Sequence, residues 1–371
     1  MKILIVGQFI EPPFAEGVTN VILNWSRALS EANVDIQVLS LSSKYSGRHQ
    51  IFSVNFEYVK TKNPRFQNTL SDVFTLQGAV IKRSKGFDIV HYALNADGIS
   101  SIPSLSLLKL NNSKAVNSYH ADHLVKSTHF FRNTLFNAFT VPSKRMFDLF
   151  KQKINSQKMR IIPPCVDTEL FQPRDKIQAR EKLGIPKDDF LIFTVGHFKR
   201  GRRLLPLVQT VEELVKKRKN IRLLIGWTGH GKEADIKEAF ATFKKKKFVT
   251  IVPPTDLINL YYNAIDVYVL SATSDYVIEM PMSLIEALSS GVPTLSFDIN
   301  AVPEIIENGV NGYLIEDGNF NQMKNILNQL IEDESLLKEL SKNARNSILN
   351  HFSYKAVGHQ LESLYTELME K

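Results

Sequence analysis

The chain has 371 residues, of which 43% are hydrophobic and 23% are charged. This length predicts two domains rather than one, since domains average about 150 residues. The composition is that of an ordinary globular protein, which excludes collagen-like, disordered and coiled-coil chains. Lys and Arg outnumber Asp and Glu by 46 to 38, and the resulting net charge of +8 favours anionic partners such as nucleotide phosphates, acidic lipids or nucleic acid.

The single cysteine, Cys165, excludes an intramolecular disulfide and favours a reducing compartment. A zinc site built from several cysteines is excluded for the same reason. The first apolar run, residues 1–7, is too short for the core of a signal peptide, and no run approaches the roughly 18 apolar residues of a membrane span. We therefore expect a cytoplasmic protein, with peripheral contact at the cytoplasmic face of a membrane as the alternative.

The first half of the chain alternates apolar runs that are typical of strands with amphipathic helical stretches. Helices are expected at 18–32 and at about 66–82, and Ser143 is placed to cap a helix that runs to about Lys153. Strands are expected at 3–6, 36–41, 52–58, 88–92, 115–119, 139–141 and 159–162.

A second series of strands follows a segment rich in proline and charge between Pro163 and Asp189. Its strands are expected at 191–195, 221–225, 249–252, 267–270, 294–297 and 313–315. Strands that alternate with helices predict parallel sheets with right-handed connections. The expected fold class is therefore α/β, with two doubly wound, Rossmann-like lobes. Ligands of such lobes bind beyond the carboxyl ends of the strands, so we expect a cleft between the lobes to hold the site.

The segment 275–293 carries the strongest chemical signal. Pro281 suits the first turn of a helix, and Gly291 with Pro293 ends it. The start of this helix should present free backbone amides, those of Met282, Ser283 and Leu284. Such a helix start is a natural site for a phosphate or diphosphate, and Glu286, one turn further, is placed to accept hydrogen bonds from a ribose diol.

This segment resembles the acidic signature of the retaining GT-B glycosyltransferases of the GT4 class, which pairs two glutamates seven residues apart around a helix start. The similarity continues through a Gly-x-Pro turn at Gly291 and a Pro-Glu-Ile-Ile tail from Pro303. Residues 158–171 resemble the strand and interdomain turn of the family, and residues 351–365 resemble its crossing helix.

The resemblance covers essentially the whole chain and implies the GT-B architecture with an interdomain cleft. It implies an acceptor-side domain at 1–172, completed by a C-terminal helix at 351–371 that crosses back to it. Residues 173–350 would then form the nucleotide-sugar-binding domain.

Some positions depart from the family pattern. Ile278 stands at the place of the first glutamate, and Glu279 follows it. We expect Glu279 to reach the donor sugar, with substitution by Asp275, or loss of the contact, as alternatives. Asn300 and Ala301 stand where the family often has two glycines, while Glu304 remains and is expected near the donor.

A cluster of basic residues follows Gly196. Members of the family usually carry an arginine just after this glycine and a lysine before the next one, and both contact the leaving diphosphate. His197 occupies the arginine place, while Arg200 fits the lysine place if the loop is about two residues shorter. Lys199 is the second candidate. The residues alone are also compatible with a solvated turn.

The first half offers two further candidates. Gly17 resembles part of a family glycine pair ahead of the first long helix and permits close backbone approach, although a plain turn glycine is equally compatible. His120 follows a strand and matches a histidine that reaches the donor sugar or the acceptor side in the family. A structural histidine is the alternative, and His91, at another strand end, is the weaker candidate.

The resemblance implies a metal-independent, retaining glycosyltransferase that moves a sugar from a nucleotide-diphosphate sugar to a hydroxyl of a glycan or lipid-linked acceptor, with no cofactor. The expected catalytic residues are Glu279, His120 and Arg200. The expected donor-binding residues are Glu286, Lys199, Met282, Ser283, Leu284, Gly17 and Glu304.

Two other functions stay open at this point, a non-catalytic partner subunit of the same fold and a nucleotide-sugar epimerase. A nucleic-acid partner is not expected, because the basic excess is small and the acidic segment would repel a phosphate backbone. Peripheral membrane contact through the basic and aromatic stretch 144–153 competes with a core stripe formed by Met146, Leu149 and Phe150.

Overall fold

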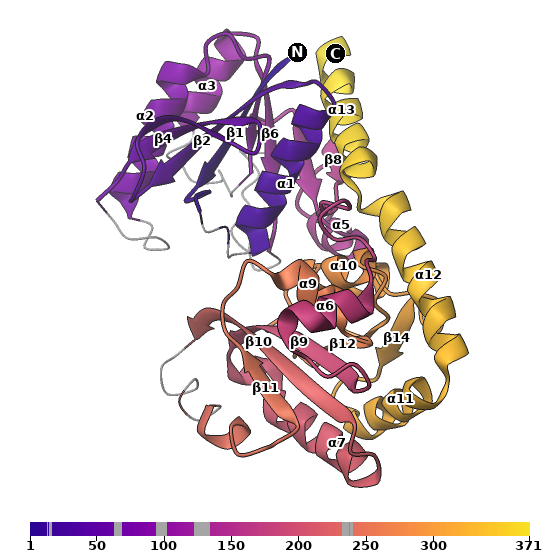
Figure 1. The fold of residues 1–371 in the computed structure, drawn as a ribbon. Coiled ribbons are helices and arrows are strands. Elements are labelled where there is room, and N and C mark those ends of the chain that lie inside the picture. The colour runs from indigo at the N-terminus through magenta and orange to yellow at the C-terminus, as the bar shows by residue number, and fades with distance from the viewer. Residues whose placement is uncertain are drawn as a thin grey trace. The chain divides into compact units, whose positions relative to one another are not determined.

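The computed structural model describes residues 1–12, 14, 17–62, 69–93, 102–121, 134–231, 237 and 240–371 (Figure 1). The chain divides into two compact units, Met1–Cys165 with Tyr354–Lys371, and Val166–Ser353. Each unit is an α/β lobe built on a parallel sheet, which confirms the predicted fold class. Within the described ranges, no helix has the length and apolar character needed to cross a membrane.

The first unit contains an eight-stranded sheet in the order β3-β4-β2-β1-β5-β6-β7-β8. Neighbouring strands are parallel except at the edge, where β3 runs antiparallel to β4. The strands are β1 (Lys2–Gln8), β2 (Asp35–Ser42), β3 (Gly47–Ile51), β4 (Val54–Lys60), β5 (Ile89–Tyr92), β6 (Lys114–Ser118), β7 (Ala138–Val141) and β8 (Met159–Ile161).

Helices complete the core of this unit. Ser143 caps α5 as predicted, since its hydroxyl accepts a hydrogen bond from the Met146 amide over 3.1 Å. Met146 and Phe150 are fully buried in the core, so the apolar side of this helix is a core stripe. The helices are α1 (Gly17–Glu31), α2 (Leu70–Arg83), α3 (Ile102–Leu110), α5 (Lys144–Phe150), the 3-10 turn Ser156–Lys158 and α13 (Tyr354–Glu370).

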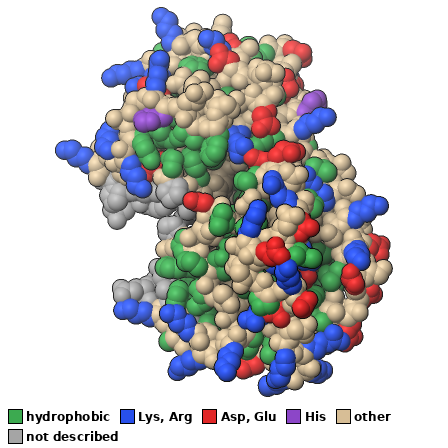
Figure 2. All heavy atoms as spheres, in the orientation of Figure 1, with side chains coloured by type: hydrophobic (Ala, Val, Ile, Leu, Met, Phe, Trp, Pro, Cys, Tyr) green, Lys and Arg blue, Asp and Glu red, His purple; other side chains and the backbone are tan. Residues whose placement is uncertain are grey.

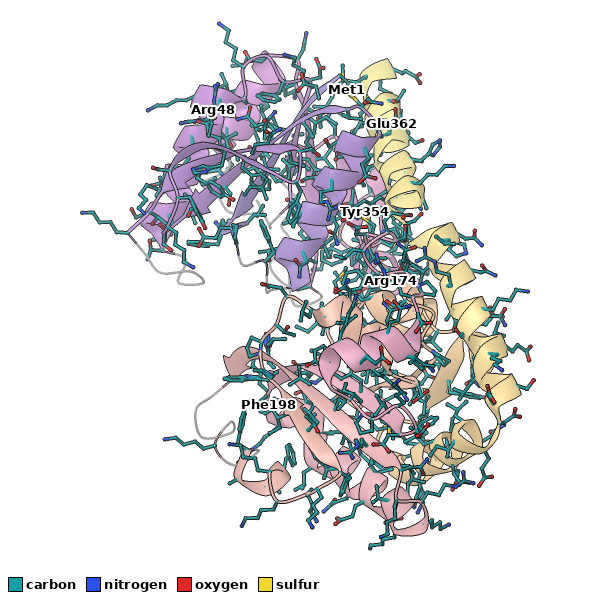
Figure 3. The ribbon with its side chains drawn as sticks, viewed as in Figure 1. Met1, Arg48, Arg174, Phe198, Tyr354 and Glu362 are labelled. Atoms are coloured by element: carbon teal, nitrogen blue, oxygen red, sulfur yellow. The ribbon has the colours of Figure 1, made fainter. Side chains whose placement is uncertain are left out.

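The C-terminal helix α13 packs against α1, as the resemblance implies (Figure 1). Gly358 allows the close approach, because a Cβ atom there would lie 3.1 Å from the carbonyl oxygen of Ala28. At the start of α13, labelled in Figure 3, the Tyr354 hydroxyl donates a hydrogen bond to Oδ1 of Asn24 over 2.8 Å. The last residues of the chain are therefore part of the first unit.

The second unit contains a six-stranded parallel sheet in the order β11-β10-β9-β12-β13-β14. Helices lie on both of its faces, with α7 beside α11 on one and α10 on the other (Figure 1). The strands are β9 (Phe190–Phe198), β10 (Ile221–Gly231), β11 (Val249–Val252), β12 (Val267–Leu270), β13 (Thr294–Phe297) and β14 (Gly312–Ile315). The helices are α6 (Lys176–Leu183), α7 (Leu204–Lys217), α9 (Ile258–Ala264), α10 (Met282–Ser289), α11 (Phe320–Glu332) and α12 (Glu334–His351), with 3-10 turns at Arg200–Arg202 and Val302–Glu304.

The division between the units falls at Cys165, ahead of the boundary placed at residue 172 from the sequence. Hydrogen bonds explain the difference, because the segment after Cys165 is bonded into the second unit. The Val166 amide donates to the Phe352 carbonyl over 2.9 Å, and the Arg345 guanidinium donates to the carbonyls of Thr168 and Phe171, each over 2.9 Å.

Surface charge is mixed in sign. On the face shown in Figure 2, lysine and arginine side chains are interspersed with aspartate and glutamate over both units. The basic excess is thus spread over this face and does not form one continuous patch.

Candidate active site

The candidate site lies at the carboxyl edge of the sheet in the second unit. β9, β12 and β13 are neighbours in this sheet, so the segments that follow them leave its edge side by side. We call these segments the basic loop (196–203, which includes the last three residues of β9), the acidic loop (271–281) and the β13 bend (298–304). The strand order reverses between β9 and β12, and ligands of doubly wound sheets bind at such a point.

The basic and acidic loops are bonded to each other. The Thr273 amide donates to the Gly201 carbonyl over 2.8 Å, and the His197 amide donates to the Tyr276 hydroxyl oxygen over 3.2 Å. A Cβ atom on Gly201 would lie 2.8 Å from Cβ of Tyr276, closer than such atoms can approach. Glycine at position 201 is therefore what lets the two loops pack together.

Arg202 is the buried cation of the basic loop, with 3% of its surface exposed. Its Nη2 donates to Oγ1 of Thr194 over 2.7 Å and to the Val195 carbonyl over 2.5 Å. The guanidinium lies 5.6 Å from the ring centre of Tyr276 and fills the space beside Gly196, where a Cβ atom would lie 2.9 Å from Arg202 Cζ. Within the described residues, no carboxylate forms an ion pair with it.

The other cations of the basic loop have different surroundings. Lys199 and Arg200 are exposed, and within the described residues neither side chain forms a hydrogen bond or an ion pair. Arg203 has a left-handed backbone, with φ of 48°, and pairs with Asp317. His197 is half-buried, and its Nδ1 lies 2.5 Å from Oγ1 of Thr228.

The start of α10 differs in one respect from the prediction. Pro281 lies just before the helix, at the N-cap, with an extended backbone. The Leu284 amide donates to the Pro281 carbonyl over 3.1 Å, so the expectation that it is free is wrong. The described residues provide no such acceptor for the amides of Met282 and Ser283, as expected for the first positions of a helix.

Glu286 lies one turn into α10 and is half-buried. The Tyr262 hydroxyl donates to its Oε2 over 3.1 Å and lies 3.3 Å from the Ser283 carbonyl. Removal from water raises the pKa of Glu286 to about 7, and the hydrogen bond from Tyr262 acts in the opposite direction. This carboxyl group is therefore balanced between its charged and neutral forms near neutral pH.

Tyr262, on α9, is a site residue that sequence reasoning missed. Its ring is fully buried against Phe193 and Tyr268, and the Tyr268 hydroxyl donates to Oγ of Ser283 over 2.8 Å. Burial raises the pKa of the Tyr262 hydroxyl well above its ordinary value, and the nearby charge of Arg202 opposes this rise. Its pattern in the sequence is that of a core aromatic residue, so nothing there marks its role.

The acidic loop carries three of the residues discussed from the sequence. Ile278 is 37% exposed, Glu279 is half-buried and Asp275 is exposed. A hydrogen bond from the Thr273 side chain lowers the pKa of Asp275. Glu304 is exposed on the β13 bend. The predicted roles of these residues stay predictions.

In the first unit, His120 follows β6 and packs against Trp25, with ring centres 5.5 Å apart. Its Nε2 is buried and has no hydrogen-bond partner in the described structure. Burial lowers the pKa of His120 to about 4, while a backbone hydrogen bond at Ala93 opposes the change. Gly17 begins α1, and a Cβ atom there would meet open space, so local packing does not require glycine.

His91 has a structural environment. It is fully buried on β5, with Nδ1 2.6 Å from the Tyr365 hydroxyl and Nε2 2.6 Å from Oγ of Ser118. Burial lowers the pKa of His91 to about 3, with a smaller contribution from the charge of His120. His91 therefore joins β5 to α13 as a neutral side chain.

Two family models together match most of the chain. The model described as Glycosyltransferase Family 4 matches residues 15–170, and the one described as Glycosyl transferases group 1 matches residues 175–347. The chain belongs to the GT4 glycosyltransferases. This confirms the resemblance stated from the acidic segment and its surroundings.

Curated relatives are about a quarter identical to the chain over the aligned residues. It is 25% identical over 205 residues to N-acetyl-alpha-D-glucosaminyl L-malate synthase of Bacillus anthracis, covering 55% of this chain and 52% of the relative. It is 27% identical over 223 residues to UDP-Gal:alpha-D-GlcNAc-diphosphoundecaprenol alpha-1,3-galactosyltransferase of Escherichia coli, covering 58% and 56%. These matches span about half the length of the relatives.

Solved structures are similar over nearly the whole chain. Sucrose-phosphate synthase from Thermosynechococcus elongatus gives a TM-score of 0.79 at 18% identity, covering 100% of this chain and 99% of that one. HepE from Anabaena, solved in complex with UDP, gives a TM-score of 0.79 at 16% identity, covering 99% and 100%. At these identities the similarity concerns the fold, and it confirms the GT-B architecture.

Proposed function

We propose that this GT4 protein transfers a sugar from a nucleotide-diphosphate sugar to an acceptor hydroxyl, with retention at the anomeric carbon. The observation that carries the proposal is Arg202, a buried guanidinium that the described residues provide only with neutral oxygen acceptors. A buried charge without a counter-charge is costly, so such a site favours an anionic ligand. A diphosphate supplies the anion that Arg202 lacks.

The neighbouring α10 suits the same ligand. The amides of Met282 and Ser283 are available at its start, and the helix dipole adds positive potential there. Glu286 follows within one turn and is assigned to the ribose hydroxyls. This arrangement would hold a nucleoside diphosphate with its phosphates at the helix start and its ribose beside the carboxyl group.

The surroundings of Arg202 and Arg203 favour Arg202 over Arg200 as the counterpart of the family lysine. The assignment of Arg200 required a loop about two residues shorter than in the family. If the loop has the same length as in the family, the lysine place moves two residues along the chain, from Arg200 to Arg202. The glycine that follows the lysine in the family then corresponds to Arg203. The left-handed backbone of Arg203 is the conformation that glycine adopts most readily, which supports this alignment.

Transfer breaks the bond between the anomeric carbon and the diphosphate and forms one between that carbon and the acceptor oxygen, and the proton of the acceptor hydroxyl passes to the leaving diphosphate. Negative charge grows on the leaving diphosphate, and fixed donors stabilise it there. Arg202 and the α10 amides are assigned this role, with Arg200 and Lys199 as outer cations. Glu279 is assigned to the donor sugar, together with His120 on the resemblance to the family.

The remaining expectations are part of the proposal. Glu304 and Gly17 are kept as donor contacts, and the transfer is proposed to need no metal or cofactor. The described residues contain no group of three or more His, Cys, Asp or Glu side chains suited to hold a metal ion. The E. coli relative is named for a diphosphoundecaprenol-linked acceptor, which supports lipid-linked glycans as the first acceptors to test.

A panel of UDP-, GDP- and ADP-sugars tests the proposal by thermal shift and by turnover. UDP-sugars come first, because HepE was solved with UDP. A ligand that binds only the folded protein raises the unfolding temperature, so binding is visible before an acceptor is known. We expect Arg202→Met to remove the shift and Arg200→Met to reduce it only slightly, with circular dichroism as the check on folding.

Arg218→Met is the matched control, because Arg218 is exposed and pairs with Glu332 away from the site. Failure of every nucleotide sugar to bind the unmodified protein would refute the proposal. So would a folded Arg202→Met variant that binds as the unmodified protein does. Sugar interconversion without an acceptor would identify an epimerase, and binding without turnover would identify a partner subunit.

A further inference from the structure

The β13 bend reaches across to the acidic loop through one side chain, that of Asn300. Its Nδ2 donates to the carbonyl oxygens of Ser274 and Val277, each over 2.6 Å. Both hydrogens of one amide group thus bind the main chain of the acidic loop. Asparagine is suited to this because a carboxamide carries two donors on a short side chain.

The backbone of Asn300 is part of the same arrangement. Its φ of 48° lies in the left-handed region, which residues other than glycine adopt at a cost and which asparagine tolerates best among them. A glycine would adopt this conformation more easily but would carry no donor. The side chain of Asn300 therefore contributes a connection that the backbone position alone does not provide.

This connection completes the anchoring of one turn of the acidic loop. On the side of the basic loop, the amide and the hydroxyl of Thr273 both contact the Gly201 carbonyl, over 2.8 and 3.3 Å. Within the turn, the amides of Tyr276 and Val277 donate to the Thr273 carbonyl over 3.1 and 3.0 Å. Asn300 holds the same turn from the β13 side.

The anchored turn leads directly into Ile278 and Glu279. The side-chain hydrogen bonds of the groups assigned to the nucleotide lie elsewhere, since Arg202 donates to β9 and Glu286 accepts from Tyr262. The anchored turn touches Arg202 through the ring of Tyr276, whose centre lies 5.6 Å from the guanidinium. Within the described residues, the Asn300 side chain makes no hydrogen bond to any of these nucleotide groups. Different residues would thus make the hydrogen bonds that hold the two ends of the donor.

We propose that Asn300 is a positioning residue for the sugar end of the donor, acting through the acidic loop and not by direct contact. This inference rests on the function proposed above. It assigns recognition of the sugar to a loop geometry that the Asn300 amide maintains, and recognition of the nucleoside diphosphate to groups that do not need it. Loss of the amide should therefore weaken binding of the nucleotide sugar and leave binding of the nucleoside diphosphate nearly unchanged.

Two variants remove the donors in different ways. Asn300→Asp keeps the size of the side chain but replaces both donors with a carboxylate, which accepts hydrogen bonds and repels carbonyl oxygens. Asn300→Gly keeps the left-handed backbone without strain and removes the side chain. Asn33→Gly is the matched control, because Asn33 is exposed in the first unit with φ of 60°.

The measurement compares the dissociation constants of UDP and UDP-glucose by calorimetry, together with hydrogen exchange of the Tyr276 and Val277 amides. For both Asn300 variants we expect UDP to bind within about twofold of the unmodified protein and UDP-glucose to bind about tenfold more weakly, a change of roughly 1.4 kcal/mol. The two amides should exchange faster. If another nucleotide sugar proves to be the donor, it and its nucleotide replace this pair.

Equal weakening of both ligands would overturn the inference, because it would indicate a general structural role. Unchanged affinity for the sugar, or unchanged exchange of the two amides, would overturn it as well. If the unmodified protein binds no nucleotide and no nucleotide sugar, the proposed function fails and the inference fails with it. Loss of sugar selectivity in an active, nucleotide-binding variant is the result that supports it.

Discussion

The Tyr262 hydroxyl donates a hydrogen bond to the Glu286 carboxyl over 3.1 Å. The tyrosine belongs to α9 and is fully buried, whereas the glutamate lies half-buried on α10. The bond engages Oε2, and within the described residues Oε1 accepts no hydrogen bond. A core aromatic residue thus sets the orientation of the carboxyl group that is assigned to the ribose.

Tyr262→Phe tests this orientation, because it removes the hydroxyl and keeps the ring packed against Phe193. The loss of one hydrogen bond of about 1 kcal/mol predicts that UDP binds about fivefold more weakly. Calorimetric titration with UDP measures the change. Tyr261→Phe is the control, because the neighbouring Tyr261 also stacks on Phe193 but its hydroxyl makes no hydrogen bond to the described residues. Equal effects of both variants would contradict the prediction.

The pKa of Glu286 predicts a dependence of stability on pH. The carboxyl group has an ordinary pKa of 4.5 and one of about 7 in the folded protein. The folded state therefore retains a proton that the unfolded state has lost, and the free energy of unfolding falls as the pH rises from 4.5 to 7. Glu286→Gln removes this loss. Its unfolding temperature relative to the unmodified protein should increase from pH 5 to pH 8.

Differential scanning fluorimetry at several pH values measures this difference in the absence of ligand. Glu304→Gln is the control, because Glu304 is exposed on the β13 bend. The unfolding temperatures of Glu286→Gln and the unmodified protein are compared at each pH. If their difference stays constant with pH, burial does not raise the pKa of this carboxyl group.

Gly201→Ala should separate the basic loop from the acidic loop. The added methyl group would lie 2.8 Å from Cβ of Tyr276 and 3.0 Å from Oγ1 of Thr273, so the backbone must move. We expect a loss of about 1 to 3 kcal/mol in the free energy of unfolding, together with weaker nucleotide binding. Urea titration measures the stability.

The same substitution at Gly78 provides the control. Gly78 lies within α2, and a Cβ atom there meets open space. Alanine should stabilise this helix by about 0.5 to 1 kcal/mol. We expect the free energy of unfolding to fall in Gly201→Ala and to rise in Gly78→Ala. A Gly201→Ala variant with an unchanged free energy of unfolding would contradict the close packing of the two loops.

Burial of His91 predicts instability in acid. Its ordinary pKa is 6.5 and its folded pKa is about 3, so the unfolded chain binds a proton that the folded chain does not. The free energy of unfolding therefore falls as the pH is lowered from 6.5 towards 3. Burial also lowers the pKa of His120, which adds to the loss of stability in acid.

His91→Gln should reduce this dependence on pH and, through weakened contacts to Tyr365 and Ser118, lower stability at pH 7.5 by about 1 to 3 kcal/mol. Urea midpoints at pH 7.5 and pH 5 measure both effects. A variant whose midpoint falls as steeply in acid as that of the unmodified protein would show that His91 is not responsible.

Hydrophobic patterning predicted most of the framework, because buried parallel strands appear as short apolar runs bounded by turns. The run at 267–270, for example, is the whole of β12, and all four of its residues are buried. The pattern fails where burial is slight. β3 lies at the sheet edge and is exposed except at Ile51, which is half-buried. α6 is a charged helix that is defined by its Asp175 cap and by Gly184 in a left-handed conformation.

The candidate site was predictable where a motif carries the chemistry. Glu286 and the first amides of α10 stand out from the local sequence. Arg202, Tyr262 and Asn300 do not, because their significance depends on partners far along the chain. Nothing in the sequence near Arg202 indicates that it is buried, and nothing near Asn300 indicates that it reaches the carbonyls of Ser274 and Val277.

The packing of α13 on the first unit has a consequence for the order of folding. A chain leaves the ribosome from its N-terminus, and its domains generally fold as they emerge. Of the two partners of His91, Ser118 precedes the second unit in the chain, whereas Tyr365 is made only after the entire second unit. The first unit is therefore completed only after the second has been synthesised, and a ribosome that stalls in the second unit leaves Nδ1 of His91 without its partner.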